Sequence, residues 1–537
     1  MNNFYLRTES IKQTDIIDLS VVNSADLSII EALKSPEPCL LEGSRGTGKS
    51  FLMKIAELEL EAADDSSVTV FVPFNMSSLI STHDNLQFYH WMLAKTLKYL
   101  LNKLRKKGIV VSNITANLLS KDENENENEI ERNLKDIVNL FEESYKGNSI
   151  IDISMLPDIE DVKEAIEILC EENSITRVYF FFDEAAHVFR PEQQRQFFNL
   201  FKDLRSPYIT CNAAIYPGVT YFGDSFELTH DCTYRKLERN IQDPDYLQYF
   251  KDIVFKQSDE KLKKEIDQNR DLFNTLAFSS GGNPRMLLKT LQDVSKFNTS
   301  NINTIIKTFY RDRIWSEHTD LGEKYKGHQY VIDWGRDFLE KTVIPAIEVY
   351  NSSRKTRGAH ESTIHFWVHK NSPETVKEAL RLLTYTGVIR KLDGSVRATR
   401  AELGTRYEVK YGCVISLESN PHNESSEFFK NLSIKKFPEF GKNHNSYAGH
   451  ENIVNIKADD QQYDKSLKSM LNKKIDVLSL LTDWQKERLK NAGIETIEQL
   501  HSNTEENLIA KIYNVGPTRA RLMKNAATAE LLEYLSG

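Results

Sequence analysis

The chain has 537 residues, which is enough for several domains, and 40% of them are hydrophobic and 27% charged. The formal net charge of −9 excludes a basic field over the whole molecule, so any DNA-binding surface must be local. The five cysteines form no C-x-x-C pair, which argues against a disulfide framework or a zinc site. No apolar segment approaches the roughly 18 residues that a membrane span needs, and we expect a cytoplasmic protein with no membrane partner.

The first 242 residues alternate strand and helix patterns, with a strand at Cys39–Glu42, a glycine-rich loop, and a helix from Lys49 to about Ala62. The run RVYFFFDE at Arg177–Glu184 is apolar up to its two acids, which predicts a parallel strand buried on both faces. Two further strands are predicted at 68–73 and 208–215. We therefore expect an α/β nucleotide-binding domain over residues 1–242.

The rest of the chain divides by composition. Residues 243–313 are helical, 314–418 mix helix and strand patterns, 419–469 are rich in Asn, Ser, Lys and Glu, and 470–537 are helical again. These ranges predict a helical lid, a mixed domain, a poorly packed linker and a small all-α domain. A low-complexity acidic tract at 120–131 is interpreted as a solvated loop or the polar start of a helix, with an acidic docking segment as the alternative.

The glycine-rich loop fits the pattern G-x-x-x-x-G-K-[ST] at every fixed position. Its backbone N–H groups and the following helix N-terminus would bind phosphate oxygens, Lys49 would reach the β- and γ-phosphates, and Ser50 would ligate Mg²⁺. We expect ATP and Mg²⁺ as cofactors. The predicted nucleotide-binding residues are Gly43, Ser44, Arg45, Gly46, Thr47, Gly48, Lys49 and Ser50.

Two acids at the end of the apolar strand are expected to act together with the glycine-rich loop. Asp183 is predicted to hold the Mg²⁺ together with Ser50, and Glu184 to polarise the attacking water. A water-activating glutamate favours hydrolysis over transfer of the phosphate to a substrate, so an ATPase is expected rather than a metabolic kinase.

A third element is the turn Gly-Gly-Asn-Pro followed by Arg285, in SSGGNPRMLLKTL at residues 279–291. An arginine in the first turn of the following helix can reach a γ-phosphate. The alternative is an ordinary solvated arginine at a helix N-terminus.

Together the three elements resemble AAA+ ATPases of the origin-recognition-complex-like, initiator-type branch of prokaryotes, and the related STAND ATPases. The resemblance covers about residues 1–310. It implies that Arg285 is the lid's γ-phosphate-sensing arginine, that Asn212 or, second, Thr210 senses nucleotide from the strand after Glu184, and that homo-oligomers form. It also implies an arginine finger for a neighbouring subunit, for which the candidates are Arg205, Arg235 and Arg239, each with an ordinary surface arginine as the alternative.

A basic island follows the predicted lid, because residues 351–410 hold 12 Lys and Arg against 6 Asp and Glu, a local net charge of +6. Its order of helix, strand, basic turn and strand resembles a winged helix. Lys377 and Arg381 on the helix, with Arg397 and Arg400 in the wing, are the predicted DNA contacts. The alternative is a module that packs against protein, with these charges solvated.

The C-terminal segment, LKNAGIETIEQLHSNTEENLIAKIYNVGPTRARL, resembles helix–hairpin–helix repeats of nucleic-acid-binding proteins. The hairpin at Gly516 and the residues after it, Thr518 and Arg519, would bind a DNA phosphate. A protein-docking module is the alternative.

Two functions remain open. The first is an ATPase that couples its nucleotide state to DNA engagement or to assembly with a partner. The second is a STAND-type signalling switch that regulates an effector protein, for instance in anti-phage defence, without remodelling DNA.

Overall fold

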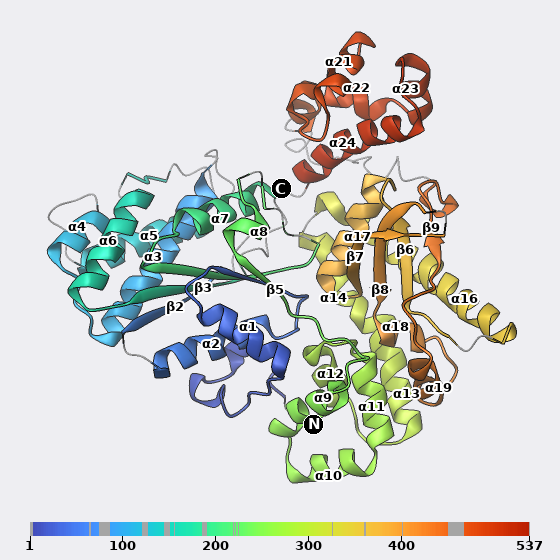
Figure 1. Cartoon of the computed structure of the whole chain (residues 1–537), viewed down its shortest axis with the longest axis horizontal. Coiled ribbons are helices and arrows are strands. Elements are labelled where there is room, and N and C mark those ends of the chain that lie inside the picture. Colours follow the sequence, from blue (N-terminus) through green and yellow to red (C-terminus); the bar gives the residue numbers. More distant parts are fainter. Residues whose placement is uncertain are drawn as a thin grey trace. The chain divides into compact units, whose positions relative to one another are not determined.

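The computed structural model describes residues 4–63, 66–74, 86–120, 127–143, 151–154, 156–184, 191–218, 220, 222–223, 225–324, 326–358, 361–399, 401–448 and 467–535. The chain forms two compact units (Figure 1). Asn2–Lys263 and Gly282–Leu288 make the first unit, and Lys264–Gly281 and Lys289–Gly537 make the second.

A five-stranded parallel sheet with the order β2-β3-β4-β1-β5 is the centre of the first unit. Its strands are β1 (Cys39–Glu42), β2 (Ser67–Pro73), β3 (Arg177–Asp183), β4 (Ile209–Ile215) and β5 (Thr233–Lys236). The four strands predicted within residues 1–242 are present within one residue of their expected bounds, and β5 is an additional strand. The α/β P-loop fold class is therefore confirmed.

Helices cover both faces of this sheet, with α1 and α2 on one face and α3, α5, α6 and α7 on the other (Figure 1). The helices that begin in this part of the chain are α1 (Ser24–Lys34), α2 (Lys49–Ala63), α3 (Gln87–Lys107), α4 (Asn113–Leu119), α5 (Glu127–Glu143), α6 (Ile159–Glu172), α7 (Pro191–Asp203), α8 (Leu228–Asp231), α9 (Tyr246–Lys256) and α10 (Glu260–Gln268).

Alternation along β3 explains why this strand is apolar without interruption. Phe180 and Phe182 pack into the core beneath α3 and α7, while Phe181 packs into the core beneath α1 and α2. All three side chains are fully buried. Side chains of successive strand residues point to opposite faces, so a strand covered on both sides is apolar at successive positions unless a polar side chain has a hydrogen-bond partner.

The second unit is mostly helical. Its helices are α11 (Arg270–Ser279), α12 (Pro284–Gln292, whose first residues belong to the first unit), α13 (Thr299–Thr308), α14 (Ile314–Lys324), α15 (Gln329–Phe338), α16 (Ile344–Thr356), α17 (Glu374–Thr386), α18 (Tyr411–Ile415), α19 (Pro421–Lys430), α21 (Asp483–Asn491), α22 (Ile497–Ser502), α23 (Glu505–Lys511) and α24 (Pro517–Leu535). A four-stranded sheet with the order β7-β8-β6-β9 packs among them. Its strands are β6 (His365–His369), β7 (Ile389–Arg397), β8 (Leu403–Val409) and β9 (Glu439–Phe440).

The order β6, α17, β7 and β8 is that of a winged helix, in which the antiparallel pair β7–β8 forms the wing. The C-terminal helices α21 to α24 enclose a separate apolar core that includes Leu489, Ile497, Leu500, Leu508 and Met523.

The predicted linker at 419–469 is folded as far as residue 448, which corrects that expectation. Helix α19 is held by its aromatic side chains, since Phe429 stacks on Phe278 with ring centroids 4.0 Å apart. Strand β9 adds to the sheet beside β6 and buries Phe440. A few well-placed aromatic residues therefore outweigh the polar composition of this segment. Residues 449–466 lie outside the described part of the chain.

Within the described ranges, none of the helices combines the length and the apolar character that crossing a membrane requires.

Removal of the Phe182 ring tests the two-sided core. Phe182 is fully buried and stacks on Phe74 at 5.5 Å and on Phe180 at 5.8 Å. We expect Phe182→Ala to lower the free energy of unfolding of the first unit by about 3–5 kcal/mol, measured as a lower urea midpoint. Tyr5→Ala in the same unit, at a side chain that is 44% exposed, is the control. Equal midpoints for the two variants would contradict this account of the core.

Candidate functional site

The carboxyl ends of three parallel strands meet at one edge of the sheet. Glu42 at the end of β1 pairs with Ile215 at the end of β4, and the Gly43 N–H donates to the Ile215 carbonyl oxygen at 3.2 Å. Strand β3 lies on the other side of β4 and ends at Asp183. The glycine-rich loop and the two predicted acids therefore share this edge.

Two glycines give the loop its shape. Gly46 and Gly48 have φ angles of 86° and 102°, a region that residues with a Cβ adopt with strain. A Cβ on Gly46 would also lie 2.9 Å from the Arg285 Cβ and 2.9 Å from the Asn283 Oδ1. Both backbone angle and space therefore require glycine at position 46.

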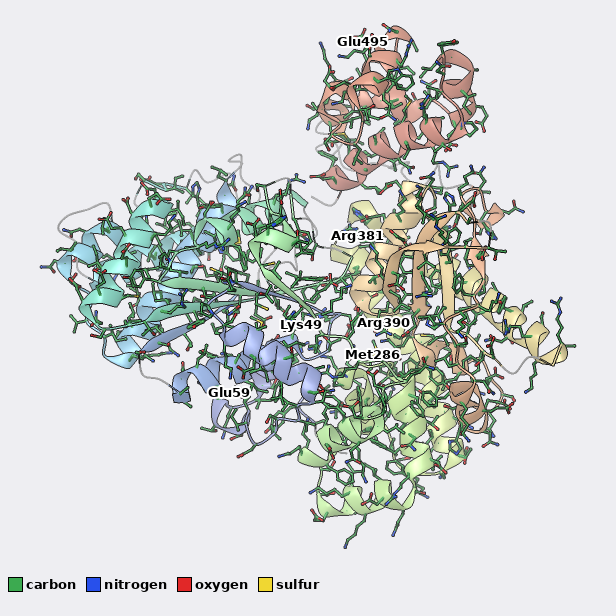
Figure 2. All side chains as sticks on the ribbon, in the orientation of Figure 1. Lys49, Glu59, Met286, Arg381, Arg390 and Glu495 are labelled. Carbon is green, nitrogen blue, oxygen red and sulfur yellow. The ribbon has the colours of Figure 1, made fainter. Side chains whose placement is uncertain are left out.

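Lys49 begins α2 (Figure 2). Its side chain is buried, with 5% of the residue exposed. Its ammonium donates to the carbonyl oxygens of Gly43 at 2.5 Å and Ser44 at 3.2 Å, and lies 4.0 Å from the centre of the Tyr216 ring. Burial lowers the pKa of Lys49 to about 7, against the opposing attraction of Asp183. The ammonium is thus desolvated at the place where the loop motif expects phosphate oxygens.

Asp183 and Ser50 are brought together, as the sequence predicted. Asp183 is buried, and burial raises the pKa of its carboxyl while a hydrogen bond from Ser50 and the charge of Lys49 oppose that rise. The Glu184 N–H donates to Asp183 Oδ1 at 3.0 Å, and this closes a tight turn at the strand end.

Glu184 follows directly in an unusual backbone conformation, with φ of 57°. A glutamate in the left-handed region is strained, and such residues cluster at functional sites. Burial and the neighbouring Asp183 raise the pKa of Glu184, while Arg45 opposes the rise. The side chain is half-buried at the same edge as the loop.

The Ser50 hydroxyl and the Asp183 carboxylate fit Mg²⁺, which prefers oxygen ligands and usually takes one or two from protein and the rest from phosphates and water. A buried carboxylate with a raised pKa also gains from a nearby cation. Within the residues that the structure describes, no three His, Cys, Asp or Glu side chains gather as a metal-binding group. Ser50 and Asp183 would therefore hold the ion only together with a bound nucleotide.

Arg285 also reaches the loop. Its backbone N–H lies 3.4 Å from the Gly46 carbonyl oxygen, its Nε donates to the Leu6 carbonyl oxygen at 2.9 Å, and its charge lowers the pKa of Lys49. The predicted γ-phosphate-sensing arginine is thus placed beside the phosphate-binding loop, within the first unit.

Asn212 is not brought to the loop. It pairs with Cys39 at the beginning of β1, its Oδ1 accepts from the Cys39 N–H at 3.1 Å, and its Nδ2 donates to the Leu33 carbonyl oxygen at 2.8 Å. Thr210 lies still farther from the carboxyl edge and donates to the Pro36 carbonyl oxygen. Both side chains hold α1 and the chain after it against the sheet, and their hydrogen bonds are made away from the phosphate-binding loop.

The arginine candidates differ in their surroundings. Arg205 lies just before β4, on the edge opposite the loop, where it is half exposed near Glu37. Arg235 is exposed on β5. Arg239 is 8% exposed and donates to the Thr47 carbonyl oxygen at 2.7 Å, which places it behind this chain's own loop rather than at an outward-facing position.

Sequence reasoning missed Tyr216 altogether and gave Arg239 a different role. Tyr216 follows β4, so the register of parallel strands is the signal that could have pointed to it, once β4 was known to lie next to β1. No motif marks Arg239, which reaches the loop only through its position after β5.

The predicted DNA contacts on the winged helix separate into two groups. Helix α17, which carries Arg381 (Figure 2), is buried over most of its surface. Arg381 pairs with the buried Glu378, with Nε donating at 2.7 Å. Burial alone would raise the pKa of Glu378, but Arg381 and His328 lower it to about 2. The structure therefore corrects the prediction for Arg381, whose charge is used internally.

Lys377 on the same helix is half-buried and pairs with Glu374 at 3.0 Å. Arg397, at the end of the wing strand β7, is exposed. Arg400 lies outside the described residues. Of the predicted contacts on this domain, Arg397 is the one that the described wing presents openly to solvent.

The amino end of α17 contacts the C-terminal helix α24. The Glu374 N–H donates to Asn525 Oδ1 at 3.1 Å, and Asn525 Nδ2 donates to the Ser372 carbonyl oxygen at 3.2 Å. The Ser372 hydroxyl, two residues before this helix begins, is buried and makes no hydrogen bond among the described residues. Asn525, from a distant part of the chain, therefore caps the amino end of α17.

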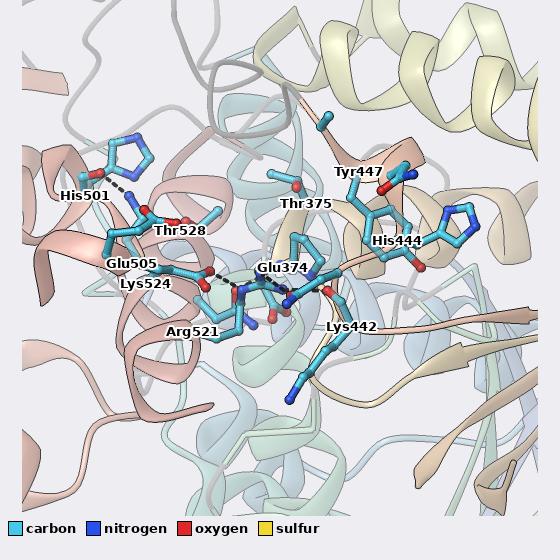
Figure 3. Close-up of a pocket in the computed structure, with 16 residues that line it drawn as sticks. Glu374, Thr375, Lys442, His444, Tyr447, His501, Glu505, Arg521, Lys524 and Thr528 are labelled. Atoms are coloured by element: carbon cyan, nitrogen blue, oxygen red, sulfur yellow. Dashed lines mark hydrogen bonds and ion pairs between the residues drawn. The ribbon is translucent and has the colours of Figure 1, made fainter. Parts of the chain in front are cut away.

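A cavity of about 340 Å³ lies beside this contact, between α24 and residues 442–448 (Figure 3). Arg521 on its wall donates to the carbonyl oxygens of Asn371 at 3.2 Å and Lys442 at 3.0 Å, and pairs with Glu505. Its guanidinium is engaged by the protein itself.

The C-terminal hairpin is open to solvent. Gly516, Thr518 and Arg519 are exposed, and Asn514 turns the chain with φ of 63°. Arg519 donates to the Asn514 carbonyl oxygen at 2.6 Å, and so closes the turn before α24. The hairpin therefore presents the first turn of a 19-residue helix to solvent.

No family model matches the sequence, and no curated protein matches it. Among solved structures, the chain is similar to the ORC1 protein of Aeropyrum pernix in complex with DNA. The two chains are 12% identical, the match covers 77% of this chain and 98% of that chain, and the TM-score is 0.33. A likeness of this size leaves the chemistry of the site to be argued from its own residues.

The lowered pKa of Lys49 gives a pH signature. The ordinary value is 10.5 and the folded value about 7, so the unfolded chain holds this proton more tightly. Below about pH 7 the buried charge of Lys49 lowers the free energy of unfolding by its full amount. As the pH increases from 7 toward 10.5, this cost disappears and the free energy of unfolding rises. We expect the melting-temperature difference between Lys49→Met and wild type to be largest near pH 6.5 and to shrink by pH 9. Lys106→Met, at an exposed position, should show a constant difference. A constant difference for Lys49→Met as well would contradict the buried charge.

Proposed function

We propose that the chain binds ATP with Mg²⁺ and hydrolyses it, as an AAA+-type ATPase of the origin-recognition-complex-like kind. The observation that carries this proposal is the meeting of Lys49, the Ser50–Asp183 pair and Glu184 at one edge of a parallel sheet. ATP is a substrate of the right chemistry, because the site offers a cation, a metal position and a carboxylate within one loop and one strand end.

Each residue then has a defined task. Lys49 would compensate charge on the β- and γ-phosphates, and Ser50 with Asp183 would hold Mg²⁺, which supplies further charge compensation when bound. Water attacks the γ-phosphorus, its proton passes to Glu184, and the bond from that phosphorus to the β–γ bridging oxygen breaks, giving ADP and phosphate. A raised pKa suits Glu184 for accepting a proton near neutral pH. Arg285, beside Gly46, would stabilise charge on the γ-phosphate.

Two substitutions test this assignment. Lys49→Ala should abolish ATP binding, because the ammonium that meets the phosphates is gone. Glu184→Gln should keep binding and lower kcat by about 10²–10⁴-fold, the usual range for loss of general base catalysis. ATP turnover and calorimetric binding give both readouts, and Glu172→Gln, an exposed carboxylate on α6, is the control. Unchanged turnover in Glu184→Gln would rule out its role as the base.

We further propose that nucleotide state is coupled to DNA engagement through the wing and the C-terminal hairpin. Lys391 and Arg397 are exposed on β7, and the hairpin exposes Gly516, Thr518 and Arg519. Lysine and arginine side chains and helix N-termini contact DNA phosphates without regard to sequence. The wing would contact DNA in place of helix α17, because α17 is buried.

Charge reversal on the wing tests DNA engagement. Lys391→Glu/Arg397→Glu should weaken binding of duplex DNA by at least about tenfold at low salt and reduce the salt slope by about 2, since two phosphate contacts are lost. Fluorescence anisotropy with duplex and single-stranded DNA measures both. Lys341→Glu/Lys430→Glu applies the same charge change elsewhere on the second unit. If wild-type protein binds neither DNA at low salt, DNA engagement is excluded.

The second candidate function is a STAND-type switch acting on an effector protein. It is favoured by the burial of α17, whose amino end is capped by Asn525 and whose Arg381 is paired internally, as in a module that packs against protein. Nucleotide-dependent oligomerisation or effector binding, in protein that fails to bind DNA, would select the switch.

A further inference from the structure

The phosphate-binding loop is held by hydrogen-bond donors that lie outside the loop. Three consecutive carbonyl oxygens of the loop accept such bonds. Asn283 Nδ2 donates to the Arg45 oxygen at 2.8 Å, the Arg285 N–H lies 3.4 Å from the Gly46 oxygen, and Arg239 Nη1 donates to the Thr47 oxygen at 2.7 Å.

These bonds fix the direction of the loop's N–H groups. In a trans peptide the carbonyl of one residue and the N–H of the next point in opposite directions. A carbonyl of Arg45 held outward therefore turns the Gly46 N–H inward, and a carbonyl of Thr47 held outward does the same for the Gly48 N–H. Among the described residues, neither of these two N–H groups has a protein acceptor, so both can serve an anion.

Arg239 is itself rigidly placed. Its Nη2 donates to the buried Asp26 at 2.9 Å and to the Tyr249 hydroxyl at 2.6 Å, and its guanidinium lies 4.7 Å from the centre of the Tyr249 ring. Asp26 belongs to the capping box at the start of α1. A planar guanidinium with several fixed donors can bond Thr47 and Asp26 together, whereas a lysine offers a single point charge.

The side-chain amide of Asn283 makes two hydrogen bonds. Its Oδ1 accepts from the Met286 N–H at 3.2 Å and so caps α12, while its Nδ2 holds the Arg45 carbonyl. The side chain is 2% exposed. The amide of asparagine suits this position because it is both donor and acceptor.

We propose that Arg239 and Asn283 are positioning residues of the nucleotide site, which turn the Gly46 and Gly48 N–H groups toward the phosphates by holding the carbonyls behind them. This inference rests on the proposed ATP-binding function. It assigns Arg239 to the loop of its own chain, in place of an arginine finger for a neighbour. It also predicts an effect on phosphate affinity that is separate from the chemical step.

Two conservative variants test it. Arg239→Lys keeps a charge for Asp26 and loses the fork that reaches Thr47. Asn283→Ser keeps a helix-capping oxygen and loses the donor to Arg45, since serine is a good cap with a shorter side chain. We expect each to weaken the binding of Mg²⁺-ATP and of inorganic triphosphate by about tenfold, the size of one lost hydrogen bond to a well-placed partner, with kcat at saturating ATP changed less than about threefold.

Calorimetric titration with Mg²⁺-ATP and with inorganic triphosphate measures the affinities, and turnover at saturating ATP measures kcat. Arg132→Lys, at an exposed arginine on α5, is the matched control. A melting temperature within a few degrees of wild type shows that a variant is folded; should Arg239→Lys fail to fold, Asn283→Ser alone decides the result. Unchanged affinity in a folded variant overturns the inference and leaves the ATPase assignment intact. Wild-type protein that binds neither ATP nor triphosphate overturns both.

Discussion

The register of the parallel sheet is the constraint on which the site depends. Because Glu42 pairs with Ile215 and β4 separates β1 from β3, the phosphate-binding loop and Asp183 emerge at one edge and meet across the end of β4. Ser50 at the start of α2 and Asp183 at the end of β3 come into hydrogen-bond contact only through this arrangement. Phe180, Phe181 and Phe182 secure it by filling the cores on both faces.

Burial shifts the pKa values of three side chains in the site. Lys49 is desolvated and holds its proton weakly, whereas Asp183 and Glu184 are shifted in the opposite direction. Opposed shifts of this kind mark candidate functional sites, and in the proposed function a polyphosphate with Mg²⁺ would bring opposite charge to all three groups. The left-handed backbone of Glu184 adds local strain at the residue proposed to accept a proton.

Much of the first unit could be predicted from sequence because its signals are local. The loop pattern fixes Lys49 and Ser50, and an uninterrupted apolar run fixes β3 and the acids at its end. Asn212 was predicted from its place on the next strand, but a strand residue faces the site only near the carboxyl end, and Asn212 lies level with the start of β1. Strand register is a non-local property, and no pattern within β4 discloses it.

The remaining differences between the predictions and the structure also come from contacts between residues that are distant in the sequence. Arg381 carries the pattern of a DNA-contacting helix, yet it pairs with Glu378, whose burial depends on how the helices around α17 assemble. Arg239 was indistinguishable in sequence from an exposed arginine, and only the approach of Asp26 and Tyr249 gives it a rigid position. The folded segment at 419–448 depends on aromatic contacts with α11 and β6 that its own polar composition conceals.

The cap on α17 has a consequence for the order of synthesis. The Glu374 N–H and the Asn525 side chain that accepts it are separated by 151 positions along the chain. At translation rates of about 5–20 residues per second, the amino end of α17 leaves the ribosome many seconds before its cap is made. The winged-helix part therefore emerges with an uncapped helix, and the later synthesis of α24, which carries Asn525, completes it.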